Sequence, residues 1–246
     1  MALETVPDTV STVSTVSTVD PVSTVSDTVS KCDMRHRSSR RHEDIFLQPM
    51  LGALKRARFG ILSMAITYMF SVLVGMTMAI NGNRYAVAYR DRIVRNATTS
   101  DRAMRAMFSG QMLRAAILDF GGNLFLGAVP TTVAGLGIIP PYPMAGYRGW
   151  VGGIVSIDGD HRSRLNNAKE RGYYLGVLIL QLIPFSLTGG AGVYLGLAWY
   201  GKWRESGFVR RWSLPLPRSA LVDALWIYAL AVPLFLIASL FEFLAR

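Results

Sequence analysis

The sequence predicts an all-α fold, a polytopic helical membrane protein of about five spans with broken Gly/Pro-rich helices. First, 51% of the 246 residues are hydrophobic and only 17% are charged. Second, several uncharged runs reach the roughly 20 helical residues that cross a hydrocarbon core of about 30 Å. Third, the stretch from Ile117 to Ile157 contains nine glycines and four prolines, and its only charged residues are Asp119 and Arg148. Such an apolar, interrupted segment is tolerated inside a membrane protein, where small residues let helices approach closely.

Residues 1–42 are expected to form a disordered low-complexity and basic tail, ahead of a helical membrane domain at 43–246. Ser-Thr-Val triplets recur up to Lys31, and no basic region followed by an apolar block indicates a secretory signal. A cluster of arginines follows before residue 43, and a cluster of this kind favours a cytoplasmic membrane surface. His36 and His42 do not match helical spacing, so they predict no metal site.

The first span is predicted at 59–80, a run of apolar residues without a single charge. It stops at Asn81-Gly82-Asn83, a turn signal. Ser71 and Gly75 lie four residues apart and predict a seam where another helix packs closely.

Residues 84–114 form a basic amphipathic segment, with seven arginines against Asp91 and Asp101. Apolar side chains recur at helical spacing in both halves, and Ser100 is placed to cap the second helix. These apolar positions are Tyr85, Tyr89 and Ile93, then Met104, Met107 and Phe108. We expect two helices that lie at the membrane interface or pack as a small extramembrane cap.

The next two spans are predicted at 117–139 and 142–157, joined by a turn that three prolines impose. Pro130 is expected to kink or interrupt the first of them. The second is short, and both a full pass and a re-entrant segment remain open for it. Within it, Gly149 and Gly153 have the spacing of a helix-packing motif.

The last two spans are predicted at 173–200 and 220–244, after a polar loop at 158–171. Pro184 indicates that the first of them is bent or split. Gly192 and Gly196 are predicted to pack against a neighbouring helix. The loop carries two aspartates and one histidine but lacks the third carboxylate that a calcium loop needs.

The placement of charge bears on localisation and partners. The basic residues behind the net charge of +10 stand next to apolar runs, which favours lipid headgroups over nucleic acid as their partner. They divide almost equally between the two sides of a five-span topology. The dense cluster before the first span favours a cytoplasmic N-terminus in the cell membrane, and five spans then put the C-terminus outside.

Polar residues inside predicted spans are the candidate functional residues, because burying such groups in a membrane is costly. They are Asp119, Asn123, Gln181 and Glu242. Asp119 and Asn123 are four residues apart and share a helix face. The alternative for Asp119 is an interfacial position in which it pairs with Arg114, one helical turn earlier.

No motif indicates catalysis, so the chain is not expected to be an enzyme or to bind a cofactor or metal. The sequence contains no HExxH, Walker loop, GxGxxG or GxSxG, and no nucleophile stands beside an evident base. Its single cysteine, Cys32, excludes an internal disulfide and a thiol-based zinc site.

The order of elements resembles the stage II sporulation protein M family of integral membrane proteins over about residues 59 to 244. Phe120 with Asn123, Gly127 and Gly135 resembles the opening of that family's Gly-rich region. The run PLFLIASLFEF at 233–243 is similar to the family's terminal phrase. The resemblance implies that this chain acts as a membrane partner of other proteins. In spore formers, members of the family act alongside peptidoglycan-degrading proteins.

The chain departs from this family in its penultimate span. The family often has Pro-His-Gly and a glutamate there, whereas this chain has Pro184-Phe185-Ser186 and no glutamate. A polar site inherited from the family would therefore lack its histidine and glutamate.

Two functions remain open from the sequence. The packing glycines and the lack of catalytic residues favour a non-enzymatic scaffold or assembly partner in a membrane complex, surrounded by lipid and bound to other membrane proteins. The alternative is a transporter or permease subunit. It is favoured by prolines within three spans and by the polar residues at Asp119, Asn123 and Gln181.

Overall fold

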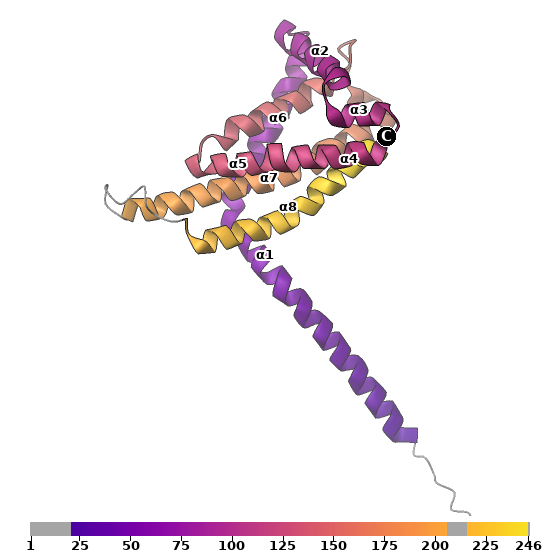
Figure 1. Cartoon of the computed structure of the whole chain (residues 1–246), viewed down its shortest axis with the longest axis vertical. Helices are drawn as coiled ribbons and strands as arrows, with labels where there is room; N and C mark the ends of the chain where they lie inside the picture. Colours follow the sequence, from indigo (N-terminus) through magenta and orange to yellow (C-terminus); the bar gives the residue numbers. More distant parts are fainter. Residues whose placement is uncertain (1–20, 206–215, 246) are drawn as a thin grey trace, which may run out of the picture. The chain divides into compact units, whose positions relative to one another are not determined.

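The computed structural model describes residues 21–205 and 216–245, and the described chain is helical without any β-strand, as predicted (Figure 1). The α-helices are α1 (Pro21–Ile80), α2 (Arg84–Thr99), α3 (Arg102–Phe108), α4 (Met112–Gly121), α5 (Val129–Ala134), α6 (Pro141–Val155), α7 (Ala168–Glu205) and α8 (Arg218–Leu244). A π-helix, η1 (Gly122–Ala128), and two short 3-10 helices, η2 (Gly135–Gly137) and η3 (Arg164–Asn166), lie between them.

The chain divides into two compact units, Met1–Phe46 and Leu47–Arg246. In the first, the structure has helix from Pro21 onward, where the sequence analysis expected disorder through residue 42. Proline suits the first position of a helix, because its missing N–H would have no helical acceptor there. The expectation of disorder for residues 1–20 lies outside the described residues.

Four helical segments in the described chain are long and apolar enough to cross a membrane: Leu47–Ile80, Met112–Gly137, Glu170–Lys202 and Arg218–Leu244. The predicted count of five is wrong, because α6, the element at the expected 142–157 span, has only 15 residues. At 1.5 Å per residue it extends about 22 Å, short of a hydrocarbon core of about 30 Å.

The short helix α6 runs alongside α1 in the same direction. Gly149 lies against the backbone carbonyl of Tyr68, and four residues later Gly153 lies against that of Val72. After the segment Met112–Gly137 the chain turns back into α6, so that the two form the long and short arms of a hairpin (Figure 1). The short arm returns the chain to the end of α1, where the His161 ring stands 3.0 Å from the Ala79 carbonyl.

At Pro130, where a kink or an interruption is expected, the chain stays helical, with a π-helical turn just before the proline. The helix passes from α4 through the π-helical turn η1 into α5, which holds Pro130 in its first turn. A π-helical turn is wider than an α-helical one, and we attribute the accommodation of the proline ring to it. The neighbouring Thr131 hydroxyl donates to the Gly127 carbonyl at 2.7 Å. Pro184 and Pro233 likewise lie inside single α-helices, α7 and α8.

The amphipathic segment folds as two helices with defined caps. Asn83 caps α2, and Asp101 caps α3 by accepting from the backbone N–H groups of Ala103 and Met104. Ser100, expected as the cap of the second helix, instead ends α2. An ionised carboxylate one residue later suits a helix N-terminus better, because it also meets the positive end of the helix dipole.

One face of α1 is apolar and uncovered. Exposed large side chains recur three or four residues apart along it, whereas the buried residues Met64, Tyr68 and Val72 line the opposite, packed face. The exposed side chains are Phe59, Leu62, Ile66, Phe70 and Leu73. A continuous apolar stripe of this kind is unfavourable in water and is expected where lipid or another protein covers the helix.

Candidate functional site

The predicted polar residues lie beside the C-terminal turns of α8, where residues of two other helical segments form hydrogen bonds with it. Asp119, on α4, accepts two hydrogen bonds at one carboxylate oxygen: from the Asn123 side-chain amide at 2.8 Å and from the buried Ser239 hydroxyl of α8 at 2.7 Å. The structure thus brings Asp119 and Asn123 together on one helix face and adds a partner from α8. The alternative partner Arg114 donates instead to Gln111, at 2.9 Å.

The other two predicted polar residues meet one turn further along α8. The Gln181 side-chain amide of α7 donates to the Glu242 carboxylate at 2.7 Å. The Tyr173 hydroxyl, also on α7, donates to the Glu242 backbone carbonyl at 2.7 Å. All four predicted polar residues therefore make hydrogen bonds, and both groups join α8 to a neighbouring helix.

A further charged group, Arg148 on α6, lies half-buried among the helices. Its guanidinium stands 4.1 Å from the centre of the Phe185 ring of α7, a cation–π contact. Gly127 makes room for it, since a Cβ there would lie 2.6 Å from the Arg148 Nη2 atom. In the part of the chain that the structure describes, Arg148 makes neither an ion pair nor a hydrogen bond. The sequence signal was present, because Arg148 and Asp119 are the only charges between Ile117 and Ile157.

Two more polar groups were missed by the sequence analysis. Thr132 of α5 lies 2.6 Å from the Tyr228 hydroxyl of α8 and donates to the Thr188 carbonyl of α7 at 2.9 Å. This contact joins three helical elements. Threonine is common in apolar helices, so its spacing alone carries no signal.

The second missed group is an ion pair. Arg56 of α1 binds Asp223 of α8, which also accepts a hydrogen bond from the Tyr194 hydroxyl at 2.9 Å. Asp223 stands one turn inside an apolar span, which is the signal that could have indicated a buried partner.

The glycines expected at packing seams stand where helix backbones touch. A Cβ on Gly149 or Gly153 would meet the backbone of α1. A Cβ on Gly192 would lie 2.6 Å from the Thr132 carbonyl oxygen, and one on Gly196 would meet the Gly135 carbonyl. Every one of the four contacts is with backbone, which cannot move aside as a flexible side chain can.

The chemistry available to these groups is limited. Among residues 21–205 and 216–245, no three His, Cys, Asp or Glu side chains are grouped as metal ligands. His161 stands beside a backbone carbonyl in the loop after α6. The geometry of the described residues thus supplies mainly hydrogen bonds between helices, together with the half-buried cation of Arg148.

Over residues 21–205 and 216–245, fold and site define a helical chain with four segments able, by length and composition, to cross a membrane. Polar side chains join these segments. Comparison with protein-family models, curated proteins and solved structures found no match to the chain.

Proposed function

We propose that this chain is a multi-pass protein of the cell membrane, with its N-terminus in the cytoplasm, that acts as a non-enzymatic scaffold or assembly partner. The observation that carries the proposal is the use made of the interior polar groups. Asp119, Asn123, Gln181 and Glu242 hydrogen-bond to one another or to α8, so they hold helices together. Because these polar groups stabilise the arrangement of the helices, binding to other proteins would take place on the outer faces.

Two further features support a binding role. The exposed stripe of α1 offers Phe59 and Phe70, with 71% and 67% of their surfaces accessible, to another membrane helix or to lipid. Backbone contacts at Gly149 and Gly192 make the helices behind this face a firm support. The resemblance to the stage II sporulation protein M family points toward the same role.

The test is isolation of the full-length protein from its native membrane. The protein carries an affinity tag at either end in separate strains and is extracted in mild detergent after brief cross-linking. We expect at least one other membrane protein to co-purify in constant proportion with both tags. An unrelated multi-pass protein expressed at the same level is the control. A chain that always runs alone and monomeric would contradict the proposal.

The alternative function, a transporter or permease subunit, is favoured by Arg148. An interior cation without an ion pair among the described residues, next to a π-helical turn, is a feature of membrane sites that bind anions or move charge. Proteoliposomes that hold the purified chain and a pH-sensitive dye test this alternative under an imposed voltage. Voltage-driven flux that disappears in Asp119→Leu, Gln181→Leu and Arg148→Gln would favour transport over the scaffold.

A further inference from the structure

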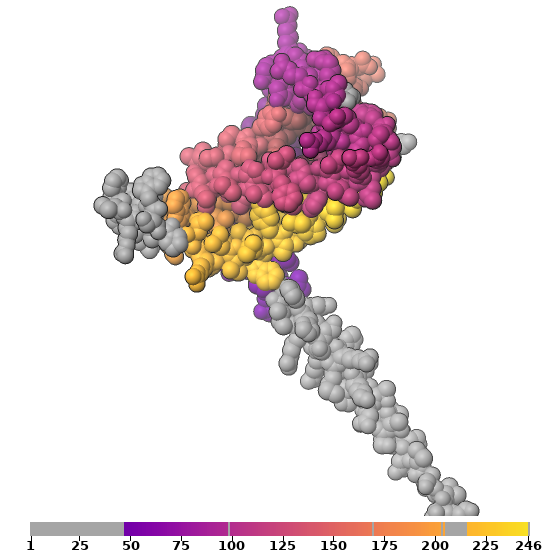
Figure 2. Space-filling view, in the orientation of Figure 1, coloured from indigo at the N-terminus to yellow at the C-terminus, as the bar shows by residue number. Residues whose placement is uncertain are grey.

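A basic pocket lies where α3 meets α4, in the segment that is magenta in Figure 2. Its cavity of about 460 Å³ is lined by Arg102, Arg105, Ala106, Ser109, Arg114 and Leu118. Three arginines therefore line one small volume.

No acidic side chain neutralises these three arginines in the described chain. Arg114 donates to the neutral amide oxygen of Gln111, and Arg102 and Arg105 make no hydrogen bond or ion pair there. The nearest carboxylate in sequence, Asp101, caps α3 through one oxygen and is not among the residues that line the pocket, which carry three positive charges and no negative one. The pocket is therefore positively charged. Guanidinium forks bind the oxygens of phosphate groups with particular affinity.

A second cavity, about 640 Å³ and mainly apolar, adjoins the first and shares Arg114 and Leu118 with it. Its other lining residues are Gly110, Gln111, Met112, Leu113 and Ile117. Met112 begins the second membrane-spanning candidate, so this cavity lies where the polar cap gives way to the apolar helix. Leu113 and Ile117 are more than half exposed. A phosphate site next to an open hydrocarbon surface matches a lipid, with its headgroup above and its acyl chains below.

The pocket has a fixed geometry. Gly110, with φ of +80°, makes the turn between α3 and α4, a conformation that favours glycine. The buried side chains of Ala103, Ala106, Ala115 and Ala116 then pack the two helices against each other. Arginines from both helices are thus held around one volume.

We propose that this pocket binds the phosphate group of an anionic membrane lipid, with the acyl chains along Leu113 and Ile117. Soluble phosphate shares the headgroup chemistry but has no part to occupy the apolar cavity. Binding at one defined pocket differs from the diffuse attraction of any basic surface to anionic lipid, and the two respond differently to substitution.

The experiment measures the thermal unfolding midpoint of the full-length protein in mild detergent. Phosphatidylglycerol, phosphatidylcholine and inorganic phosphate are titrated separately. We expect phosphatidylglycerol to raise the midpoint in a saturable way and the other two to leave it nearly unchanged. The Arg102→Gln/Arg105→Gln variant should bind phosphatidylglycerol with an affinity at least about tenfold lower than that of the wild type, because two charged donors are lost.

The matched control is Arg84→Gln/Arg92→Gln, which removes the same charge from exposed positions on α2 outside the pocket. It should keep the wild-type response. Equal losses in both double variants, or a full response in the pocket variant, would overturn the proposal in favour of diffuse attraction. If inorganic phosphate shifted the midpoint as much as phosphatidylglycerol does, the claim that the bound phosphate group belongs to a lipid would be overturned. Arg102 and Arg105 are exposed and unbonded, so their replacement should leave folding intact, and an unchanged elution volume checks this.

Discussion

Arg56 and Asp223 form a two-pronged ion pair whose partners lie in different surroundings. Arg56 Nε donates to one carboxylate oxygen of Asp223 at 2.6 Å, and Nη2 donates to the other at 2.5 Å. The Arg56 side chain is 53% exposed, whereas that of Asp223 is only 6% exposed. The pair fastens α1 to the first turns of α8, and the cost of breaking it depends on which partner is removed.

The first prediction follows from this asymmetry. Arg56→Gln leaves a buried carboxylate with only the Tyr194 hydroxyl, so we expect it to lower the free energy of unfolding by about 1–3 kcal/mol. Asp223→Asn should cost less, because the exposed guanidinium can be solvated. Denaturant unfolding in mild detergent measures both. Lys55→Gln, the same charge change at an exposed neighbour on α1, is the control. Equal losses for Arg56→Gln and Lys55→Gln would contradict the role of the pair.

The second prediction concerns the seam between α5 and α7. Gly192→Ala places a Cβ 2.6 Å from the Thr132 carbonyl oxygen, so it should lower stability by about 1–3 kcal/mol through overpacking. Gly201→Ala on the same helix meets nothing within 4 Å and should be neutral or stabilising by about 0.5–1 kcal/mol. The thermal unfolding midpoints of the two variants, each compared with that of the wild type, measure these effects. A Gly192→Ala protein as stable as Gly201→Ala would show that the seam is not closely packed.

The third prediction concerns the cation–π contact between Arg148 and Phe185. Gly127→Ala should push the guanidinium off the ring and cost about 0.5–2 kcal/mol. Because Arg148→Gln removes the same contact, the double variant should be hardly less stable than either single one. Gly122→Ala, in the same π-helix but facing open space, is the control. Additive losses from Gly127→Ala and Arg148→Gln would mean that the two positions act separately.

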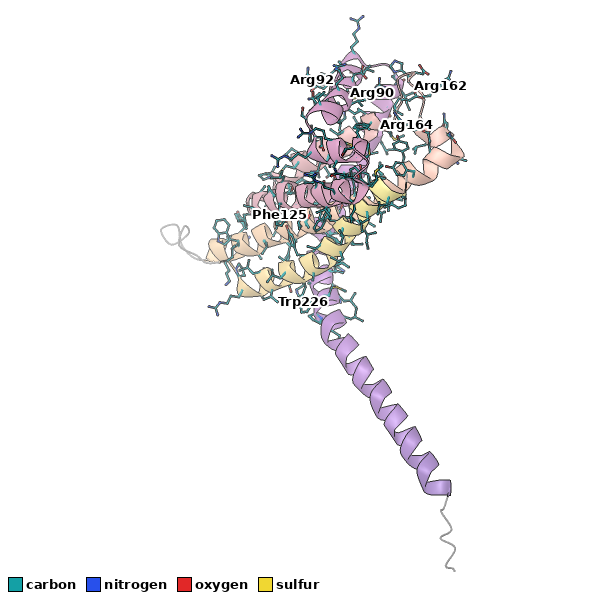
Figure 3. All side chains as sticks on the ribbon, turned by 45° about the vertical axis from the view of Figure 1, so that its right-hand side comes forward. Arg90, Arg92, Phe125, Arg162, Arg164 and Trp226 are labelled. Atoms are coloured by element: carbon teal, nitrogen blue, oxygen red, sulfur yellow. The ribbon has the colours of Figure 1, made fainter. Side chains whose placement is uncertain are left out.

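The fourth prediction concerns the loop after α6. Buried Arg90 of α2 donates to the backbone carbonyls of Ile157 and Asp158, and Figure 3 shows it at the same end of the protein as Arg162 and Arg164. Arg90→Gln should release this loop, and amide hydrogen exchange at 157–164 should accelerate about tenfold or more. Exposed Arg92→Gln on the same helix should leave the exchange rates unchanged. Similar acceleration of exchange in both variants would show that the contact between Arg90 and this loop does not hold the loop in place.

Local signals in the sequence predicted local structure well. The turn signal at Asn81-Gly82-Asn83 marks the end of α1 at Ile80, with Gly82 at φ of +65°. The four-residue spacing of Asp119 and Asn123 correctly placed their side chains in contact. Spacing rules work here because the interacting groups belong to one continuous helix.

The errors arose where a second element decides the outcome. Proline rules predicted a kink or an interruption at Pro130 but not its form, a π-helical turn before the ring with the Thr131 hydroxyl bonded to the Gly127 carbonyl. Hydropathy predicted a fifth span at the apolar run 142–157, with a full pass and a re-entrant segment both open, whereas α6 has only 15 residues. The partner of Asp119 on α8 is 120 residues away in sequence, and nothing in one sequence specifies that pairing.

The position of α8 has a consequence for biosynthesis. Ribosomes make this helix after the others, yet it supplies Ser239 to Asp119 and Glu242 to Gln181. In the membrane topology proposed above, Asp119 and Gln181 stand in hydrocarbon without these hydrogen-bond partners until α8 enters the bilayer, and unpaired polar groups are costly there. In that topology, insertion of α8 therefore completes these two contacts, and a ribosome that stalls before α8 leaves a loosened intermediate that quality-control proteases can cleave.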